Sequence, residues 1–208
     1  MSEVNNAVCR RCRVEKTKLF LKGDKCLSNK CPVERRAYAP GQHGRLRRRI
    51  LGYGIQLREK QKLKRFFGMS EKQFRLFFKR AEQQRGVTGE NLLSLLERRL
   101  DNVVYLAGFA DSRPQARLLV AHGHFLINGR RVSSPSYPVD KEDLIVFGEN
   151  SAKREGLRAV AEGHRNKAVP GWLEVNWDKL QARVVSLPTR ADVTIPVEEH
   201  LVVELYSK

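Results

Sequence analysis

The residues His122-Gly-His-Phe-Leu-Ile-Asn-Gly-Arg-Arg-Val132 predict a β-hairpin that follows directly on a helix. Phe125 to Ile127 and Arg130 to Val132 are the expected strands. Asn128-Gly129 between them is the dipeptide that most strongly favours a two-residue hairpin turn. His122-Gly123-His124 ends the preceding helix. The second half of the chain is therefore expected to contain antiparallel strands.

Helical periodicity dominates the residues before the hairpin. We expect four helices there: Tyr53 to Gly68, one capped at Ser70, one capped at Thr88 with an apolar stripe to about Ala107, and a short one capped at Ser112. Ser70 with Gln73, and Ser112 with Gln115, are capping-box pairs, whose side chains satisfy free N–H groups of a first turn. Pro114 falls in such a turn, where its missing N–H costs little.

Short strands and helices alternate after the hairpin. The pattern predicts strands at Leu144–Phe147, Trp172–Val175 and Arg183–Leu187, and a helix at 151–163. For Val197–Tyr206 the four-residue spacing of the apolar residues favours a helix, and a strand is the alternative. Residues 1–44 have little apolar periodicity and are expected to be irregular, held by something other than a hydrophobic core. The expected fold class is α+β, with a helical N-terminal domain that carries a metal-bound cysteine segment, and a second domain of antiparallel strands and helices. The expected regions are 1–44, 45–95 joined by 196–208, and 96–195.

The excess positive charge lies entirely in the first half of the chain. The 208 residues have a formal net charge of +17. Residues 1–100 hold 26 Lys and Arg against 9 Asp and Glu, whereas residues 101–208 hold 14 of each. A compact chain with this charge repels itself, so we expect a polyanion to neutralise it, nucleic acid first and an anionic membrane surface second.

The sequence indicates neither a membrane protein nor an enzyme. The longest run without Lys, Arg, Asp or Glu, Leu118 to Gly129, is far shorter than the roughly 20 residues of a spanning helix. Residues 1–6 contain no apolar signal segment. H-E-x-x-H, G-x-S-x-G and P-loop motifs are absent from the sequence. We therefore expect a cytoplasmic protein with no enzyme activity, no membrane partner and no small-molecule substrate.

All four cysteines fall in one cluster with the spacing C-x2-C-x13-C-x4-C: Cys9, Cys12, Cys26 and Cys31. Two closely spaced pairs of thiolates are typical ligands of tetrahedral Zn²⁺. Two disulfides are a weaker hypothesis in a reducing cytoplasm, and four idle thiols are a third. We expect one structural Zn²⁺ per chain. A [4Fe-4S] cluster, which four thiolates also hold, is the alternative.

Three groups of residues are candidates for contact with RNA. The first is a basic segment in which arginines can bridge phosphates and an aromatic ring can stack on a base: Arg35, Arg36, Tyr38, Gln42, His43, Arg45, Arg47, Arg48 and Arg49. The second extends it onto a helix: Lys60, Lys62, Lys64 and Arg65. The third surrounds a helix N-terminus, which favours phosphate, and the hairpin: Ser112, Arg113, Arg117, Arg130 and Arg131. An ordinary solvated surface is the alternative, and for the third group the two hypotheses are about equal.

Several blocks of the sequence resemble one protein family. Leu96-Glu-Arg-Arg-Leu-Asp-Asn-Val-Val-Tyr105, Ser112-Arg113 with Ala116-Arg117, and residues 122–132 resemble the αL RNA-binding domain of the family of small-subunit ribosomal protein number four. The remaining blocks that resemble this family are Arg36-Ala-Tyr-Ala-Pro-Gly-Gln-His-Gly44, Leu57-Arg-Glu-Lys-Gln-Lys-Leu63 and Leu201-Val-Val-Glu-Leu-Tyr-Ser207. The family has forms with and without the cysteine cluster, and this chain has all four cysteines.

The resemblance implies an RNA-binding structural protein of the small ribosomal subunit. It implies a primary rRNA binder that nucleates assembly of the subunit's body at a multi-helix junction. Ribosomal protein number five and other small-subunit proteins are implied partners, and the implied position lies beside the path by which mRNA enters. Two other hypotheses are an RNA-modifying enzyme, for which the chain lacks room for a catalytic domain, and a zinc-ribbon nucleic-acid-binding regulator, for which a recognition-helix pattern is missing.

Overall fold

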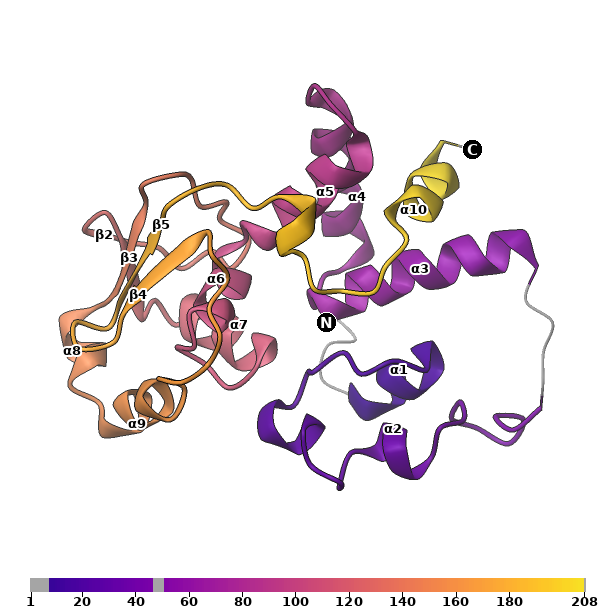
Figure 1. Cartoon of the computed structure of the whole chain (residues 1–208), viewed down its shortest axis with the longest axis horizontal. Coiled ribbons are helices and arrows are strands. Elements are labelled where there is room, and N and C mark those ends of the chain that lie inside the picture. The colour runs from indigo at the N-terminus through magenta and orange to yellow at the C-terminus, as the bar shows by residue number, and fades with distance from the viewer. Residues whose placement is uncertain (1–7, 47–50, 208) are drawn as a thin grey trace. The chain divides into compact units, whose positions relative to one another are not determined.

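The computed structural model describes residues 8–46 and 51–207, and the chain divides into two compact units (Figure 1). Unit 1 comprises residues 1–92 and 195–208, and unit 2 comprises residues 93–194. Over the described ranges, no helix is both long and apolar enough to cross a membrane.

The N-terminal part of unit 1 contains three short helices: α1 (Val8–Glu15), the 3-10 helix η2 (Gly23–Cys26) and α2 (Pro32–Arg35). Leu19 and Leu21 between them are buried, with 1 % and 5 % of their surface exposed. The prediction of irregular structure for residues 1–44 is therefore wrong for these elements. They are too short to produce a visible apolar period in the sequence.

The helices α3 (Gly52–Phe66), α4 (Glu71–Gln83) and α10 (Glu199–Tyr206) form the main body of unit 1. The predicted stop after α3 and the predicted cap of α4 are confirmed, since Gly68 has a φ of +61° and Ser70 Oγ accepts the N–H of Gln73 at 3.3 Å. α4 buries the stripe that its spacing predicts: Phe74, Phe77, Phe78 and Ala81. α10 packs on α3, and the Tyr206 ring stacks on Phe78 with the centroids 4.5 Å apart.

The single helix predicted from Thr88 to about Ala107 is two helices, α5 (Thr88–Glu97) and α6 (Leu100–Leu106). Arg99 between them has an extended backbone and pairs with Pro138. The N–H of Leu100, at the start of α6, donates to the carbonyl of Tyr137 (2.9 Å). The break is not visible in the sequence pattern, because the apolar residues of both α5 and α6 are buried and continue one stripe.

Antiparallel strands form the sheet of unit 2 in the order β2-β1-β3-β5-β4. The strands are β1 (Phe125–Ile127), β2 (Arg130–Arg131), β3 (Leu144–Phe147), β4 (Leu173–Asn176) and β5 (Gln181–Val184). The hairpin is confirmed, because Asn128 and Gly129 have φ angles of +49° and +80°. β5 begins two residues before the predicted strand and ends earlier, because its register is determined by pairing with β3 and β4.

The remaining helices of unit 2 are α7 (Arg113–Ala121), α8 (Glu149–Ala152), α9 (Glu155–Gly163) and the 3-10 helix η3 (Arg190–Asp192). The one helix predicted over 151–163 is thus two. The capping box predicted at Ser112 is wrong, because the Ser112 side chain makes no cap hydrogen bond and Gln115 Oε1 accepts the N–H of Asp111 (2.8 Å) instead. The α+β class, with its helical N-terminal region and antiparallel sheet, is confirmed.

Candidate nucleic-acid interface

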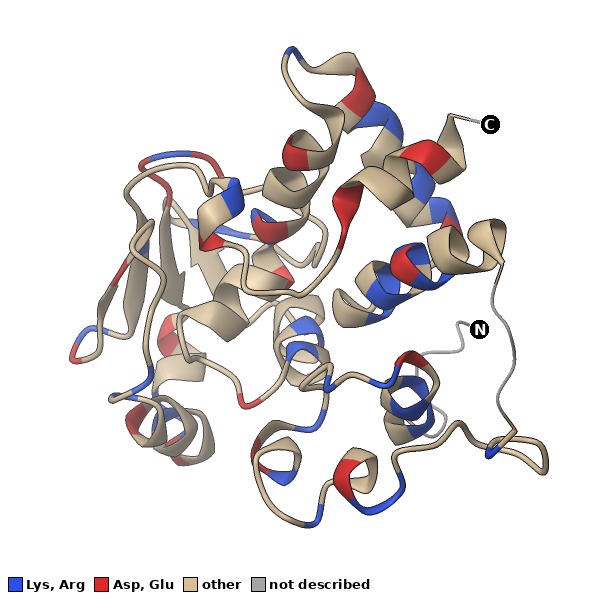
Figure 2. Cartoon of the chain, turned by 45° about the vertical axis from the view of Figure 1, so that its right-hand side comes forward, with Lys and Arg blue, Asp and Glu red and all other residues tan. Residues whose placement is uncertain are grey.

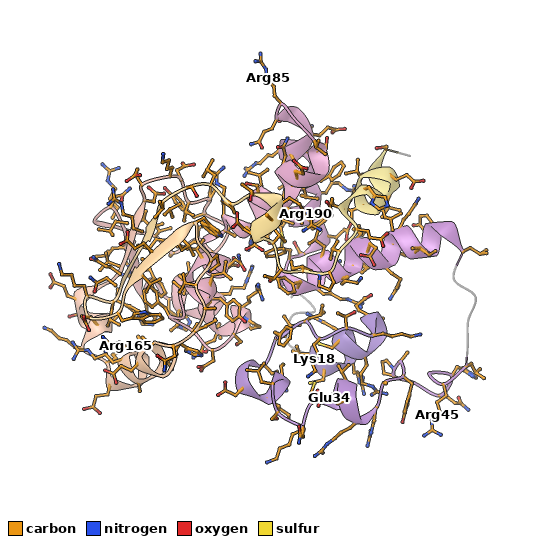
Figure 3. The ribbon with its side chains drawn as sticks, viewed as in Figure 1. Lys18, Glu34, Arg45, Arg85, Arg165 and Arg190 are labelled. Atoms are coloured by element: carbon orange, nitrogen blue, oxygen red, sulfur yellow. The ribbon has the colours of Figure 1, made fainter. Side chains whose placement is uncertain are left out.

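Tyr38 lies at the centre of the basic segment 35–46 of unit 1. The guanidinium groups of Arg13 and Arg45 lie over its ring, 5.1 and 4.9 Å from the centroid. Arg13 Nε also donates to the Tyr38 carbonyl (3.0 Å), and a hydrogen bond from Arg45 lowers the pKa of the Tyr38 hydroxyl. The ring predicted to stack on a base is therefore already in contact with two cations. Figure 3 shows Arg45 on the outside of this loop.

The other predicted contacts of this segment are exposed where the structure describes them: Arg35, Arg36, Gln42, His43 and Arg45. Gly44 allows the loop to close on itself, because a Cβ at this position would lie 1.8 Å from the Ala39 carbonyl oxygen. Arg47, Arg48 and Arg49 lie outside the described residues. As RNA contacts, all of these residues stay a prediction.

The predicted RNA contacts on α3 are each held by a carboxylate of unit 1. Lys60 Nζ and Lys64 Nζ lie 2.7 and 3.0 Å from the two oxygens of Glu71. Lys62 Nζ lies 2.6 Å from Glu59, and Arg65 pairs with Glu15 of α1. Figure 2 shows residues of both charges along α3. The structure thus neutralises much of the charge that the sequence places on this helix, and an RNA contact by these residues stays a prediction.

Arg113 is buried at the start of α7, with 7 % of its surface exposed. Its Nε donates to Asn102 Oδ1 (2.8 Å), and its guanidinium lies 4.4 Å from the centroid of the Tyr105 ring. Burial lowers the pKa of Arg113, while the field of Glu97 opposes this shift. A phosphate contact by Arg113 is not supported, because its side chain is enclosed in unit 2.

The block from Glu97 to Asn102 forms a polar network inside unit 2. Asp101 accepts from Arg99 Nε and Nη2 at 3.0 and 2.6 Å, and from Arg117 Nη1 at 3.3 Å. The Asn102 amide donates to the Glu97 carbonyl (3.0 Å). Most of this conspicuous charged block therefore stabilises the turn between α5 and α6. Arg117 stays partly exposed at its edge, and Ser112 is half-buried.

The two arginines of the hairpin are both exposed, but their surroundings differ. Arg131 donates from Nε to the Gly123 carbonyl and from Nη2 to the His122 carbonyl, each at 3.0 Å. In the part of the chain that the structure describes, Arg130 makes no hydrogen bond or ion pair of this kind. Arg131 therefore caps the C-terminus of α7, and Arg130 is the freer donor.

Arg154, at the start of α9, is a basic residue near the hairpin that sequence reasoning missed. Burial lowers the pKa of His124, and the charges of Arg154, His122 and Arg131 lower it further. His124 Nδ1 lies 2.8 Å from Ser151 Oγ. No sequence pattern could have identified Arg154, because only the tertiary structure brings the α8–α9 connection to the end of α7.

The four cysteines lie in one part of unit 1 as free thiols. Cys12, Cys26 and Cys31 are buried, Cys9 is half-buried, and the N–H of Lys22 donates to Cys26 Sγ (3.3 Å). Burial raises the pKa of Cys12 and Cys26, and the other cysteines are close enough to raise both further. Among residues 8–46 and 51–207, however, no three His, Cys, Asp or Glu side chains form a group that could hold a metal ion. The donor chemistry fits zinc, but a metal-binding group is not shown.

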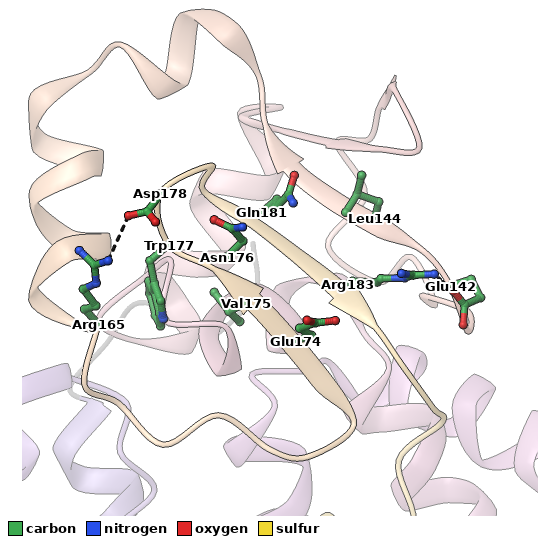
Figure 4. Close-up of a pocket in the computed structure, with 10 residues that line it drawn as sticks. All are labelled: Glu142, Leu144, Arg165, Glu174, Val175, Asn176, Trp177, Asp178, Gln181 and Arg183. Atoms are coloured by element: carbon green, nitrogen blue, oxygen red, sulfur yellow. Dashed lines mark hydrogen bonds and ion pairs between the residues drawn. The ribbon is translucent and has the colours of Figure 1, made fainter.

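A hollow in unit 2 lies beside β3, β4 and β5 (Figure 4). Its lining mixes both signs of charge: Glu142, Glu174 and Asp178 with Arg165 and Arg183. Arg165 Nη2 lies 3.0 Å from Asp178 Oδ1, and Arg183 pairs with Glu142. Three carboxylates against two guanidinium groups make this hollow a poor site for a polyanion.

Comparison with known proteins accounts for the whole chain. Residues 3–97 match the family description "Ribosomal protein S4/S9 N-terminal domain", and residues 98–145 match "S4 domain". A protein of Thermoanaerobacter sp. (strain X514) named "Small ribosomal subunit protein uS4" is 54 % identical over 208 residues, which are 100 % of both chains. Proteins with the same name from Clostridium tetani and Desulfotalea psychrophila are 53 % identical over 208 residues (100 % of both chains) and 56 % identical over 203 residues (97 % of both). The chain belongs to the uS4 family of ribosomal proteins.

Proposed function

We propose that the chain is a structural constituent of the small ribosomal subunit and binds the subunit's rRNA in the cytoplasm. The observation that carries this proposal is its 54 % identity, over the whole length, with a protein named for that subunit. The charge distribution supports it, because all of the +17 excess lies in residues 1–100. The described carboxylates Glu15, Glu34, Glu59 and Glu71 pair with only some of these cations.

Binding would begin with neutralisation of RNA phosphates by the exposed cations of unit 1, such as Arg36 and Arg45. Each such contact releases a condensed counterion, so affinity falls steeply with salt. Unit 2 would add donors in defined positions, because Asp101 holds Arg117 and the end of α7 holds Arg131. Donors with fixed geometry favour a folded RNA backbone of matching shape over a flexible strand.

The finer role that we propose is that of a primary rRNA binder. Cations on both units give the chain more than one point of attachment, which favours a junction of several RNA helices. Holding such a junction would nucleate assembly of the subunit's body. Contacts with ribosomal protein number five, with other small-subunit proteins and with mRNA where it enters belong to the same proposal, and the family resemblance supports them.

We further propose that Cys9, Cys12, Cys26 and Cys31 hold one structural Zn²⁺. Four free thiols in one part of unit 1, three of them buried, support this donor set, as does the Lys22 N–H directed at Cys26 Sγ. A site closed by four thiolates leaves no open position for a substrate, so the ion would contribute folding free energy and no catalysis. A [4Fe-4S] cluster stays the alternative.

Footprinting and filter binding on protein-free small-subunit rRNA test the RNA proposal. We expect protection concentrated at one multi-helix junction. If six or more phosphates are neutralised, the affinity should fall about a thousandfold or more between roughly 50 and 200 mM salt. Duplex DNA of the same length is the control ligand. Equal affinity for that duplex, or an rRNA affinity that hardly changes with salt, would contradict the proposal.

Elemental analysis of the full chain tests the metal proposal. We expect one zinc ion per chain in the wild type and loss of zinc in Cys9→Ser/Cys12→Ser. If the wild type contains iron and inorganic sulfide and no zinc, the cysteines hold a [4Fe-4S] cluster. Equal metal content in the two proteins would show that these cysteines are not ligands.

A further inference from the structure

Four exposed residues of α4 form a single stripe on unit 1: Lys72, Arg75, Leu76 and Lys79. They follow one another at intervals of three, one and three residues, and such spacing places all four on one face of an α-helix. Together with Glu71 they line a shallow hollow. The opposite face of α4 is buried in the core of unit 1, so the orientation of this stripe is determined by packing.

The three cations of the stripe, Lys72, Arg75 and Lys79, have no carboxylate partner within residues 8–46 and 51–207. The acid that shares the hollow, Glu71, already accepts from three groups. These are Lys60 Nζ (2.7 Å), Lys64 Nζ (3.0 Å) and the Tyr206 hydroxyl (3.0 Å). α4 therefore presents three cations where α3 presents ion pairs.

Leu76 adds an apolar contact in the middle of the stripe, with 51 % of its surface exposed. Arg75 lies close to the Tyr206 hydroxyl, where its charge opposes the rise in the pKa of that group that burial and Glu71 cause. An RNA backbone matches this combination, because it offers regularly spaced phosphates and, between them, the less polar faces of the sugars. From Lys72 to Lys79 the helix rises about 10 Å, at about 1.5 Å per residue, which is long enough for contact with more than one phosphate.

We infer that this stripe of α4 is a phosphate-binding face for rRNA. The density of basic residues in the sequence would predict that α3 makes this contact, but the cations of α3 are held in ion pairs. Lys72, Arg75 and Lys79 each contact a backbone phosphate, and Leu76 packs on a sugar between them. The inference rests on the proposed function and deepens it by naming the contact face.

A matched pair of triple variants tests the inference by filter binding to protein-free small-subunit rRNA at several salt concentrations. Lys72→Gln/Arg75→Gln/Lys79→Gln removes the stripe, and Lys141→Gln/Lys153→Gln/Lys179→Gln removes the same charge from exposed positions of unit 2. We expect the α4 triple variant to bind roughly ten- to a hundredfold more weakly at about 0.1 M salt, with a log–log salt slope shallower by about two to three. The unit 2 triple variant should bind almost as the wild type does. Lys72→Arg/Lys79→Arg should retain the affinity.

The outcomes separate this inference from the proposed function. A wild-type protein that does not bind rRNA overturns the proposed function. Wild-type binding together with an unchanged slope in the α4 triple variant, or with equal losses in both triple variants, overturns the α4 face alone. Thermal unfolding followed by circular dichroism checks the fold. Should the α4 triple variant be unstable, Lys79→Gln decides the matter, since it must reduce the slope by about one.

Discussion

Glu71 is the acceptor that joins three elements of unit 1. Its oxygens accept from Lys60 and Lys64 of α3 and from the hydroxyl of Tyr206 in α10. Partial burial of Glu71 opposes ionisation, but the three hydrogen bonds outweigh it and lower its pKa to about 2. One carboxylate thereby holds α4 against α3 and α10, and it also removes two lysines from the surface that could meet RNA.

Glu71→Gln is expected to destabilise unit 1 at pH 7 by about 1–2 kcal/mol, a figure reduced for solvent screening because the side chain is 38 % exposed. Its folded pKa lies below the ordinary value of 4.5, so the stabilisation is present above pH 4.5 and is lost as the pH falls towards 2. Urea unfolding followed by far-UV circular dichroism at about pH 7 and pH 3 measures the difference. Glu82→Gln, at an exposed position of the same helix, is the control, and an equal loss in both variants would contradict the prediction.

Lys167 makes the stability of unit 2 depend on pH in the alkaline range. Burial lowers its pKa to about 8, its Nζ donates to the Tyr105 carbonyl (2.8 Å), and it lies 3.9 Å from the centroid of the Tyr105 ring. Between about pH 8 and pH 10.5 the unfolded chain holds a proton that the folded chain has lost. This contribution to the stability of unit 2 therefore rises with pH in that window.

The measurement is the urea midpoint of tryptophan fluorescence at about pH 7.5 and pH 9.5. It reports on unit 2, since both tryptophans of the chain lie there. Lys167→Met should remove the part of the pH dependence that belongs to this lysine, whereas Lys179→Met at an exposed position should not. An identical pH dependence in both variants would exclude this role for Lys167.

At the scale of elements, local patterns predict structure wherever the turn chemistry of the chain decides it. Ser70 and the Asn128-Gly129 turn lie where the sequence places them, because their preferences act within a few residues. Helix breaks and ion-pair partners depend instead on residues that are distant in the sequence. The break at Arg99 depends on the strand-like segment around Pro138, and the pairing of Arg65 depends on Glu15. The sequence could therefore predict where the charge is dense, but not which cations remain exposed and unpaired.

Arg131, a candidate RNA contact, also stabilises the C-terminus of α7. Arg131→Gln is expected to lower the stability of unit 2 by about 1–2 kcal/mol, because two terminal carbonyls of the helix region lose a charged donor. Arg130→Gln, one residue away on the same strand, should change stability by less than about 0.5 kcal/mol. The urea midpoint of tryptophan fluorescence measures both. Equal effects would mean that Arg131 has no capping role, and rRNA affinity measured on the same variants separates stability from binding.

At the scale of the whole molecule, the two units depend on different kinds of core. Unit 2 contains one continuous hydrophobic cluster, built from residues between Leu100 and Val184. The N-terminal part of unit 1 buries Leu19 and Leu21 but relies on short helices and on the region of the cysteines. Removing whatever holds the cysteines together should therefore affect unit 1 and leave the core of unit 2 intact.

Cys9→Ser/Cys12→Ser puts this difference to the test. If the cysteines hold Zn²⁺, its loss removes folding free energy from the N-terminal part of unit 1 alone. Far-UV circular dichroism should then show unfolding of part of the helix content at lower urea, and rRNA affinity should fall. The tryptophan transition, which reports Trp172 and Trp177 in unit 2, should stay at the wild-type midpoint. A chelator should shift the wild type in the same way and leave the variant unchanged. A tryptophan midpoint that moves with the circular dichroism would show instead that the two units unfold as one, and the cysteine segment would then stabilise the whole molecule.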